Sequence, residues 1–183
     1  MKFKLAIAAG ALAIMSTALI AQSSVPMVGG APMYPSRNIV QNASSAQNLS
    51  TLVAAVKAAG LVDTLEEPGP FTVFAPTNSA FDKLPAGTLD MLLKSENQDK
   101  LKKVLTYHVV SGSVTWKKLV AMIKKDGGQT QIKTVEGGTI TAMMDGENVV
   151  LKDEKGGTAT VTQADVMQKN GVVHVIDAVL LPN

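Results

Sequence analysis

Residues 71–81 read FTVFAPTNSAF, and residues 171–182 read GVVHVIDAVLLP. Each segment joins β-branched and aromatic residues, which favour a strand, to polar residues where the run stops. Pro76 lacks an amide hydrogen and disfavours helix at the residue before it, so the first strand should end there. Thr77 or Asn78 can then cap the helix that follows. We expect the two segments to form the paired ends of one fold.

The second segment carries two polar side chains in an apolar strand. Strict alternation places Asp177 on the same face as Val173 and Val175, and His174 on the opposite face. A carboxylate among valines is costly unless it is hydrogen-bonded, so we expect Asp177 to accept hydrogen bonds from donors within residues 76–78. We interpret His174 as a satisfied structural histidine rather than a ligand.

The first 21 residues are typical of an export signal. Two lysines precede an apolar run over residues 5–20, and this run is shorter than the roughly 20 residues that span a bilayer. Residues 22–36 contain three prolines and two glycines without an apolar period, which predicts a flexible spacer. A single domain then fills residues 37–183. We expect a secreted protein, periplasmic or extracellular, with no transmembrane span after signal cleavage.

The composition argues against several classes of function. The chain has 17 Lys plus Arg and 15 Asp plus Glu, and two of the lysines fall in the expected signal, so the mature charges balance. Nucleic-acid binding depends on a clustered positive excess, so we expect no nucleic-acid partner. There is no cysteine, which excludes a disulfide framework and a thiolate nucleophile.

Residues suited to catalysis or metal binding are sparse. The two histidines, His108 and His174, both lie in apolar strings, and the chain has no G-x-S-x-G elbow, phosphate-cradling loop or dinucleotide motif. Acidic hairpin tips within residues 145–154 could hold calcium only loosely. Paired carboxylates for glycoside chemistry stay open, although no pattern points to them. We therefore predict no enzyme activity, no catalytic residue, no cofactor and no metal site.

The periodicity of apolar residues changes between the two halves of the chain. The first half repeats at helical spacing, whereas the second half has short runs separated by Gly-Gly and Asp-Gly pairs, which indicate antiparallel hairpins. This order favours an α+β fold, with helices packed on a strongly bent and largely antiparallel sheet. The expected helices are 48–59, 85–93, 97–108 and 116–125, and the expected strands are 71–74, 130–133, 139–143, 148–152, 159–162 and 172–180.

The chain resembles the fasciclin-type (fasciclin/beta-Ig-H3) domain, in its single-domain secreted bacterial form, through three ordered boxes. The family's TVFAPT-[ND]-x-A-F box is matched by residues 72–81. Its Tyr-His pair is matched by Tyr107 and His108, and its terminal H-V-I-D-x-V-L strand by residues 174–180. The similarity covers about residues 37–182. The signature residues to which we assign structural roles are Thr72, Phe74, Pro76, Thr77, Asn78, Phe81, His174 and Asp177.

The resemblance implies a secreted, non-enzymatic adhesion or interaction module that binds protein or polysaccharide at the cell envelope or in the matrix. In some animal members the Tyr-His pair is implicated in integrin binding, which makes Tyr107 and His108 candidate partner contacts. The helical stripe that His108 shares with Leu101, Val104 and Leu105 predicts burial instead. An alternative function is a carrier of an apolar ligand such as a carotenoid, because some fasciclin-type proteins hold carotenoids and seven methionines survive signal removal.

A second candidate partner surface lies on the helix expected over residues 116–125. Lys117, Lys118, Lys124 and Lys125 should point outward, while the apolar residues between them point inward. Such a face is usually only solvated. It could also attract an acidic polysaccharide or anionic envelope lipid, and strong salt dependence would identify that role.

Overall fold

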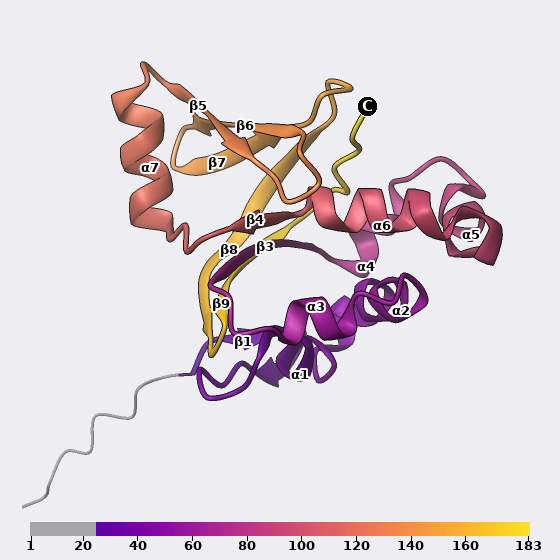
Figure 1. Cartoon of the computed structure of the whole chain (residues 1–183). Helices are drawn as coiled ribbons and strands as arrows, with labels where there is room; N and C mark the ends of the chain where they lie inside the picture. The colour runs from indigo at the N-terminus through magenta and orange to yellow at the C-terminus, as the bar shows by residue number, and fades with distance from the viewer. Residues whose placement is uncertain (1–24) are drawn as a thin grey trace, which may run out of the picture.

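The computed structural model describes residues 25–183, with helices packed around one strongly curled sheet (Figure 1). The seven strands follow the order β4-β3-β9-β8-β7-β6-β5, and all neighbours are antiparallel except β3 and β9. The expected α+β fold is confirmed, and the expected signal, residues 1–21, lies outside the described residues. The strands are β3 (Phe71–Pro76), β4 (Val109–Ser111), β5 (Gln129–Lys133), β6 (Thr139–Asp145), β7 (Asn148–Lys152), β8 (Thr158–Gln168) and β9 (Gly171–Ile176).

The two signature segments lie side by side in the middle of this sheet. Strands β3 and β9 pair in parallel, from Phe71 opposite Gly171 to Pro76 opposite Ile176. Strand β3 ends at Pro76, as the missing amide hydrogen predicts. The expected pairing of the two ends of the fold is therefore confirmed.

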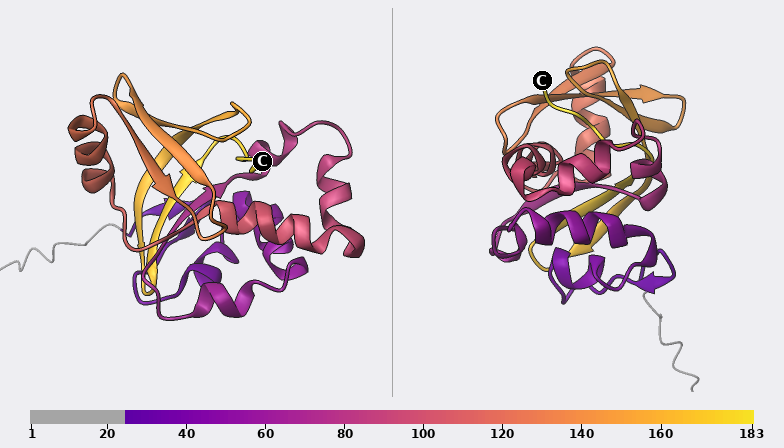
Figure 2. Two further views of the ribbon diagram at one scale, coloured as in Figure 1. Left: turned by 45° about the horizontal axis from the view of Figure 1, so that its top comes forward. Right: turned by 90° about the vertical axis from the view of Figure 1, so that its right-hand side faces the viewer.

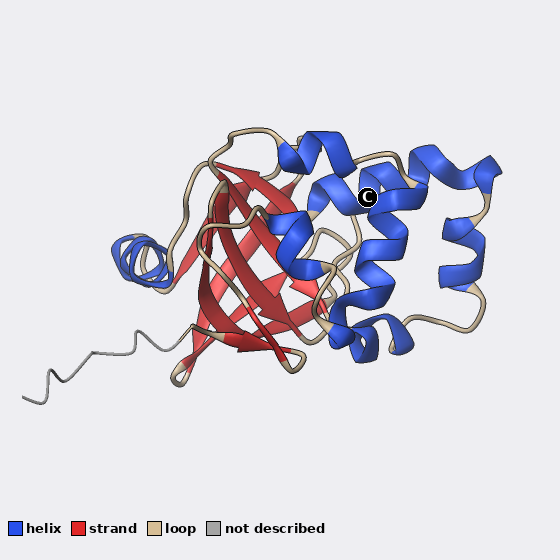
Figure 3. Ribbon diagram, turned by 90° about the horizontal axis from the view of Figure 1, so that it is seen from below, coloured by secondary structure: helices blue, strands red, loops and turns tan. Residues whose placement is uncertain are grey.

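Six helices gather on one side of the curled sheet, and the seventh, α7, stands alone on the other side (Figure 3). The four helices expected from periodicity correspond to α2, α5, α6 and α7. The cap at Thr77 also begins the expected short helix α4. The helices are α1 (Ile39–Ala43), α2 (Ser50–Ala58), α3 (Val62–Glu66), α4 (Asn78–Asp82), α5 (Thr88–Leu93), α6 (Gln98–Tyr107) and α7 (Trp116–Lys125), with 3₁₀ turns at Gln47–Leu49 and Ser95–Asn97.

The central strands divide the apolar interior into two cores. On β3, Val73 faces α1–α3, while Phe74 faces the inside of the curled sheet. On β9, Val175 faces the helices and Ile176 faces the inside of the sheet. Figure 2 shows the helical layer below and the strands β5–β7 above, with β8 and β9 running between them. The helix-side core includes Ile39, Leu52, Leu65, Val73 and Val175, and the barrel core includes Phe74, Tyr107, Leu119, Ile140, Leu151 and Ile176.

The N-terminal residues of the described part do not form a spacer. Strands β1 (Met27–Val28) and β2 (Ala31–Pro32) form a hairpin, in which Gly29 and Gly30 adopt the positive φ values that a two-residue turn requires. Val28 and Met33 are both only 2% exposed and belong to the helix-side core. The flexible-spacer expectation is therefore wrong for residues 25–36, because the Gly-Gly pair makes a turn between apolar residues that are buried.

Two strand ends differ from the expectation. Strand β8 continues to Gln168 through an irregular register, and Asp165 has a φ of 53° within it. A bulge of this kind breaks the alternation that a sequence pattern can detect. Strand β9 ends at Ile176 instead of Leu180, because the chain leaves the sheet at Asp177.

Candidate functional site

The signature residues of β3 form a polar network that fixes the start of α7. The Thr72 hydroxyl accepts a hydrogen bond from the Val114 amide at 2.8 Å and donates to the Gly112 carbonyl at 2.6 Å. Phe74 fills the barrel core, and Phe81 packs on the helix-side core. Thr77 caps α4 by accepting from the Ala80 amide. These side chains therefore hold backbone segments in place or fill the cores, and they do not form an exposed binding surface.

Asn78 caps a different helix from the one that carries it. Its Oδ1 accepts a hydrogen bond from the Thr51 amide at 3.0 Å, and its Nδ2 donates to the Gln47 carbonyl and the Ser50 hydroxyl, both at 3.0 Å. The start of α2 has no side-chain cap from its own segment. Asn78 supplies this cap from a distant position and so joins α4 to α2.

Asp177 bonds to a different segment from the one expected. Its Oδ1 accepts from the Thr160 amide at 2.7 Å, and the Asp177 amide donates to the Thr160 carbonyl at 3.2 Å. Its Oδ2 lies 3.4 Å from the Lys83 ammonium. The expectation of donors within residues 76–78 is wrong, because the chain turns away from β3 after Ile176 and meets β8.

His174 is a buried structural histidine, as expected. Its Nε2 donates to the Val114 carbonyl at 2.7 Å, and its Nδ1 accepts a long hydrogen bond of 3.4 Å from the Asp165 amide. The ring stacks on Phe74 with centroids 5.6 Å apart. Burial lowers the pKa of His174, so the ring is neutral at pH 7.

Tyr107 and His108 are also buried, so neither side chain is presented to a partner in this structure. His108 donates from Nδ1 to the Val104 carbonyl at 2.8 Å and accepts at Nε2 from the Leu180 amide at 3.0 Å. Burial lowers the pKa of His108 to about 4. The Tyr107 hydroxyl donates to the Thr139 carbonyl at 2.7 Å, and burial raises its pKa to about 12. The burial that the helical stripe predicts for His108 is therefore present in the structure.

The four lysines of α7 form the basic face, and all four are exposed. Lys117 and Lys124 lie seven residues apart, as do Lys118 and Lys125, so they occupy neighbouring stripes of one helix surface. The ion pairs among the described residues involve Lys83 and Lys103 instead.

Two contacts hold the start of α7 in place. Thr115 caps the helix by accepting from the Lys118 amide at 3.4 Å, and the Asp165 carboxylate accepts from the Trp116 amide at 2.6 Å. A carboxylate at a helix N-terminus offsets the positive end of the helix dipole, next to which Lys117 would otherwise be unfavourable. Leu119 and Ile123 anchor the opposite side in the barrel core. The basic face is thus carried by a firmly docked helix.

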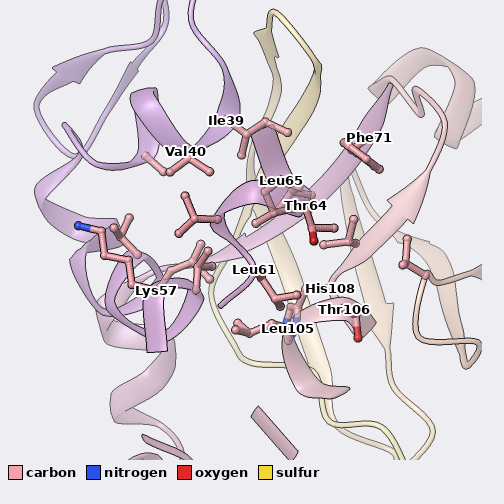
Figure 4. Close-up of a pocket in the computed structure, with 18 residues that line it drawn as sticks. Ile39, Val40, Lys57, Leu61, Thr64, Leu65, Phe71, Leu105, Thr106 and His108 are labelled. Atoms are coloured by element: carbon pink, nitrogen blue, oxygen red, sulfur yellow. The ribbon is translucent and has the colours of Figure 1, made fainter. Parts of the chain in front are cut away.

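An apolar cavity lies between the helical layer and the sheet (Figure 4). It measures about 50 Å³ and is bounded by α1, α2, α3, β3, β4, the end of α6 and Val135 in the loop after β5. Among residues 25–183, no methionine lines this cavity, and only Met33 lines the smaller apolar cavity of about 20 Å³ beside it, so most of the methionines give no support to an apolar-ligand carrier. The sequence could not indicate this cavity, because its walls come from six separate helices and strands and one loop.

One residue that the sequence did not single out positions two walls of the cavity. Asn170 is buried in the turn between β8 and β9, where its Oδ1 accepts from the Ile39 amide at 3.1 Å. Its Nδ2 donates to the carbonyls of Leu65 at 2.7 Å and Glu67 at 3.0 Å. The side chain therefore ties α1 and α3 to the sheet. A lone asparagine before a glycine predicts only a turn, so the pattern gave no sign of this role.

No ligand cluster for a metal is assembled within residues 25–183, where no group of three or more His, Asp or Glu side chains converges. Within the same residues no helix has the length and apolar character needed to cross a membrane.

The sequence comparison now identifies the family. The model described as Fasciclin domain matches residues 47–182, and the chain belongs to this family. It is 49% identical over 148 residues to Protein sll1483 of Synechocystis. This alignment covers 79% of this chain and 73% of the relative. It is 38% identical to the transforming growth factor-beta-induced protein ig-h3 of Sus scrofa, over 73% of this chain and 17% of that protein.

A solved structure shows the same fold. The FAS1 domain pair from the insect cell adhesion molecule Fasciclin I matches with a TM-score of 0.71 and 22% identity, over 80% of this chain and 51% of that chain. The chain is thus a single fasciclin domain, of a family found in adhesion and interaction proteins.

Proposed function

We propose that this protein is a secreted, non-enzymatic interaction module that binds an acidic partner at the cell envelope or in the matrix, through the basic face of α7. An acidic polysaccharide fits this face best, because repeated negative charges can meet two rows of lysines at once. The observation that carries the proposal is the exposure of four lysines on one docked helix, with no ion-pair partner for them among residues 25–183.

The position of α7 supports this use. The helix projects at the edge of the molecule, away from the other helices, where a long polymer could approach it without obstruction (Figure 1). Tyr107 and His108 are buried, so the proposal assigns neither of them a direct contact with the partner.

Retention on an immobilised acidic polysaccharide, measured over a range of salt concentrations, tests the proposal. Replacing Lys117, Lys118, Lys124 and Lys125 with Gln should abolish retention at low salt and flatten the salt dependence. A matched control replaces four other exposed lysines with Gln, so that net charge changes equally. The control lysines are Lys94, Lys100, Lys152 and Lys155. Equal losses in the two variants would show that net charge alone drives retention and would refute the α7 site.

The carotenoid-carrier alternative has weaker support. A carotenoid is a long and rigid polyene, whereas the cavity measures about 50 Å³ and could enclose only a small part of it. Absence of visible absorbance after incubation of the purified protein with carotenoids would exclude this alternative.

A further inference from the structure

The mouth of the apolar cavity is lined by side chains that the fold leaves incompletely buried. Val53, Leu61, Val62 and Phe71 are half-buried, and Val135 is 46% exposed. An occupant that covered these residues would be stabilised, because removing apolar surface from water is favourable. Here they form the rim of a hollow, so the fold provides apolar area that an occupant could bury.

Two of the polar side chains that line the cavity, His108 and Thr106, are already hydrogen-bonded, and a third, Thr64, is exposed at the mouth. Both ring nitrogens of His108 are bonded, to the Val104 carbonyl and the Leu180 amide. The Thr106 hydroxyl donates to the Lys102 carbonyl at 2.7 Å. A polar ligand would lose hydrogen bonds to water and gain none from His108 or Thr106. The part of an occupant that enters must therefore be apolar.

One cation stands at the edge of the cavity. The aliphatic stem of Lys57, in the last turn of α2, lines the wall, and its ammonium group points outward to the rim (Figure 4). Long basic side chains commonly divide in this way between apolar surface and water. No Asp or Glu is among the lining residues, and the ion pairs of the described chain do not include Lys57.

We propose that this cavity binds a single-chain anionic amphiphile, such as a medium-chain fatty acid, with the end of the tail inside and the carboxylate beside Lys57. The cavity of about 50 Å³ is lined mainly by apolar side chains and has room for the end of one alkyl chain. The half-buried rim then covers the rest of the chain. This ligand and site are independent of the α7 face.

Three probes of equal chain length test the charge and the tail separately. Octanoate, 1-octanol and octylammonium are titrated into the full chain and followed by calorimetry and by shifts of the cavity methyl NMR signals. Octanoate should bind most tightly and octylammonium most weakly. Lys57→Met keeps the stem and removes the charge, so it should weaken octanoate about two- to fivefold and leave 1-octanol unchanged. Lys152→Met on β7 is the matched control, because this exposed lysine belongs neither to the cavity nor to the α7 face, and it should bind octanoate like the wild type.

A second variant blocks the cavity without touching the core. Thr64 is exposed on α3 and lines the mouth, so Thr64→Trp should cover it while circular dichroism and the melting temperature stay those of the folded protein. Octanoate affinity should then fall at least about tenfold. Equal affinity for the three probes, no binding of any, or unchanged octanoate binding by Lys57→Met or Thr64→Trp would overturn the proposal. Shifts confined to methyls outside the cavity would do the same.

Discussion

The helix-side core and the barrel core use similar residues but are filled to different degrees. Most of the large side chains that are completely buried lie in the barrel core, including Tyr107, Phe74 and Leu151. The helix-side core contains the cavity of about 50 Å³ and a smaller apolar one of about 20 Å³, and Leu52 lines each of them. Strands that alternate strictly can pack one face without gaps, whereas short helices held by a few polar ties leave space between them. The incompletely filled core is therefore the one that can accept a ligand.

The largest expected effect comes from truncating the barrel core. Leu151→Ala should lower the free energy of unfolding by about 3–5 kcal/mol, because the fully buried side chain leaves a cavity among strands that cannot collapse. Leu52→Ala, beside existing space, should cost about 2–3 kcal/mol, because fewer contacts are lost. Urea unfolding measures both variants, and equal losses would remove the difference between the two cores.

Acid should destabilise the fold through the buried histidines. The folded pKa of His108 is about 4, below its ordinary value near 6.5, so its stabilising contribution is complete above about pH 6.5 and is lost as the pH falls through 4. Between pH 7.5 and 4 this group should account for about 3 kcal/mol of lost stability. The lowered pKa of His174 adds a loss of the same sign.

Urea titrations at several pH values measure this effect in matched variants. His108→Gln should lack the His108 share of the pH dependence, whereas His174→Gln should retain it. A wild-type pH profile in His108→Gln would contradict the neutral state assigned to this ring.

The cap that Asn78 provides tests how the helical layer is held. Asn78→Ala should cost about 1–2 kcal/mol, because the Thr51 amide loses its acceptor and two further hydrogen bonds disappear. Thermal unfolding measures the change. Asn97→Ala, which removes one exposed hydrogen bond to the Met91 carbonyl, should cost about 0.5 kcal/mol or less. Similar losses from both would mean that the link between α4 and α2 contributes little.

The smallest effects are expected at the half-exposed carboxylate of Asp177. Asp177→Ala should cost about 1 kcal/mol, because the Thr160 amide loses its acceptor while water can partly replace it. Lys83→Met should change stability by less than about 0.5 kcal/mol, because the Lys83 and Asp177 side chains are 57% and 40% exposed. Denaturant midpoints measure both, and a larger effect for Lys83 would assign the role of Asp177 to the ion pair.

The sequence predicted what depends on local pattern. The strand stop at Pro76, the cap at Thr77, the spacing of β5–β7 and the burial of His108 follow from neighbouring residues, and each is present. The three boxes also identified the family that the domain comparison confirms.

What the sequence did not predict depends on contacts between distant segments. Asp177 meets Thr160 because β9 leaves the sheet, and Asn78 caps α2 because α4 folds back on it. The bulge at Asp165 interrupts the alternation of apolar and polar residues, so the sequence did not predict the second half of β8. The cavity could not be predicted either, because it forms only when separate helices and strands pack together. Of the candidate partner contacts, only the α7 lysines are exposed, because an outward helical face can be inferred from spacing alone.

The parallel pairing of β3 with β9 also affects how quickly the fold can form. Phe71 meets Gly171 a hundred positions later, so the central pair of strands must close a loop that contains most of the domain. Closing such a loop lowers the chain entropy before any contact compensates for it, and we expect folding in roughly milliseconds to seconds. Until β9 arrives, one edge of the apolar strand β3 is uncovered. The protein concentration during refolding therefore decides whether β9 or another chain reaches that edge first.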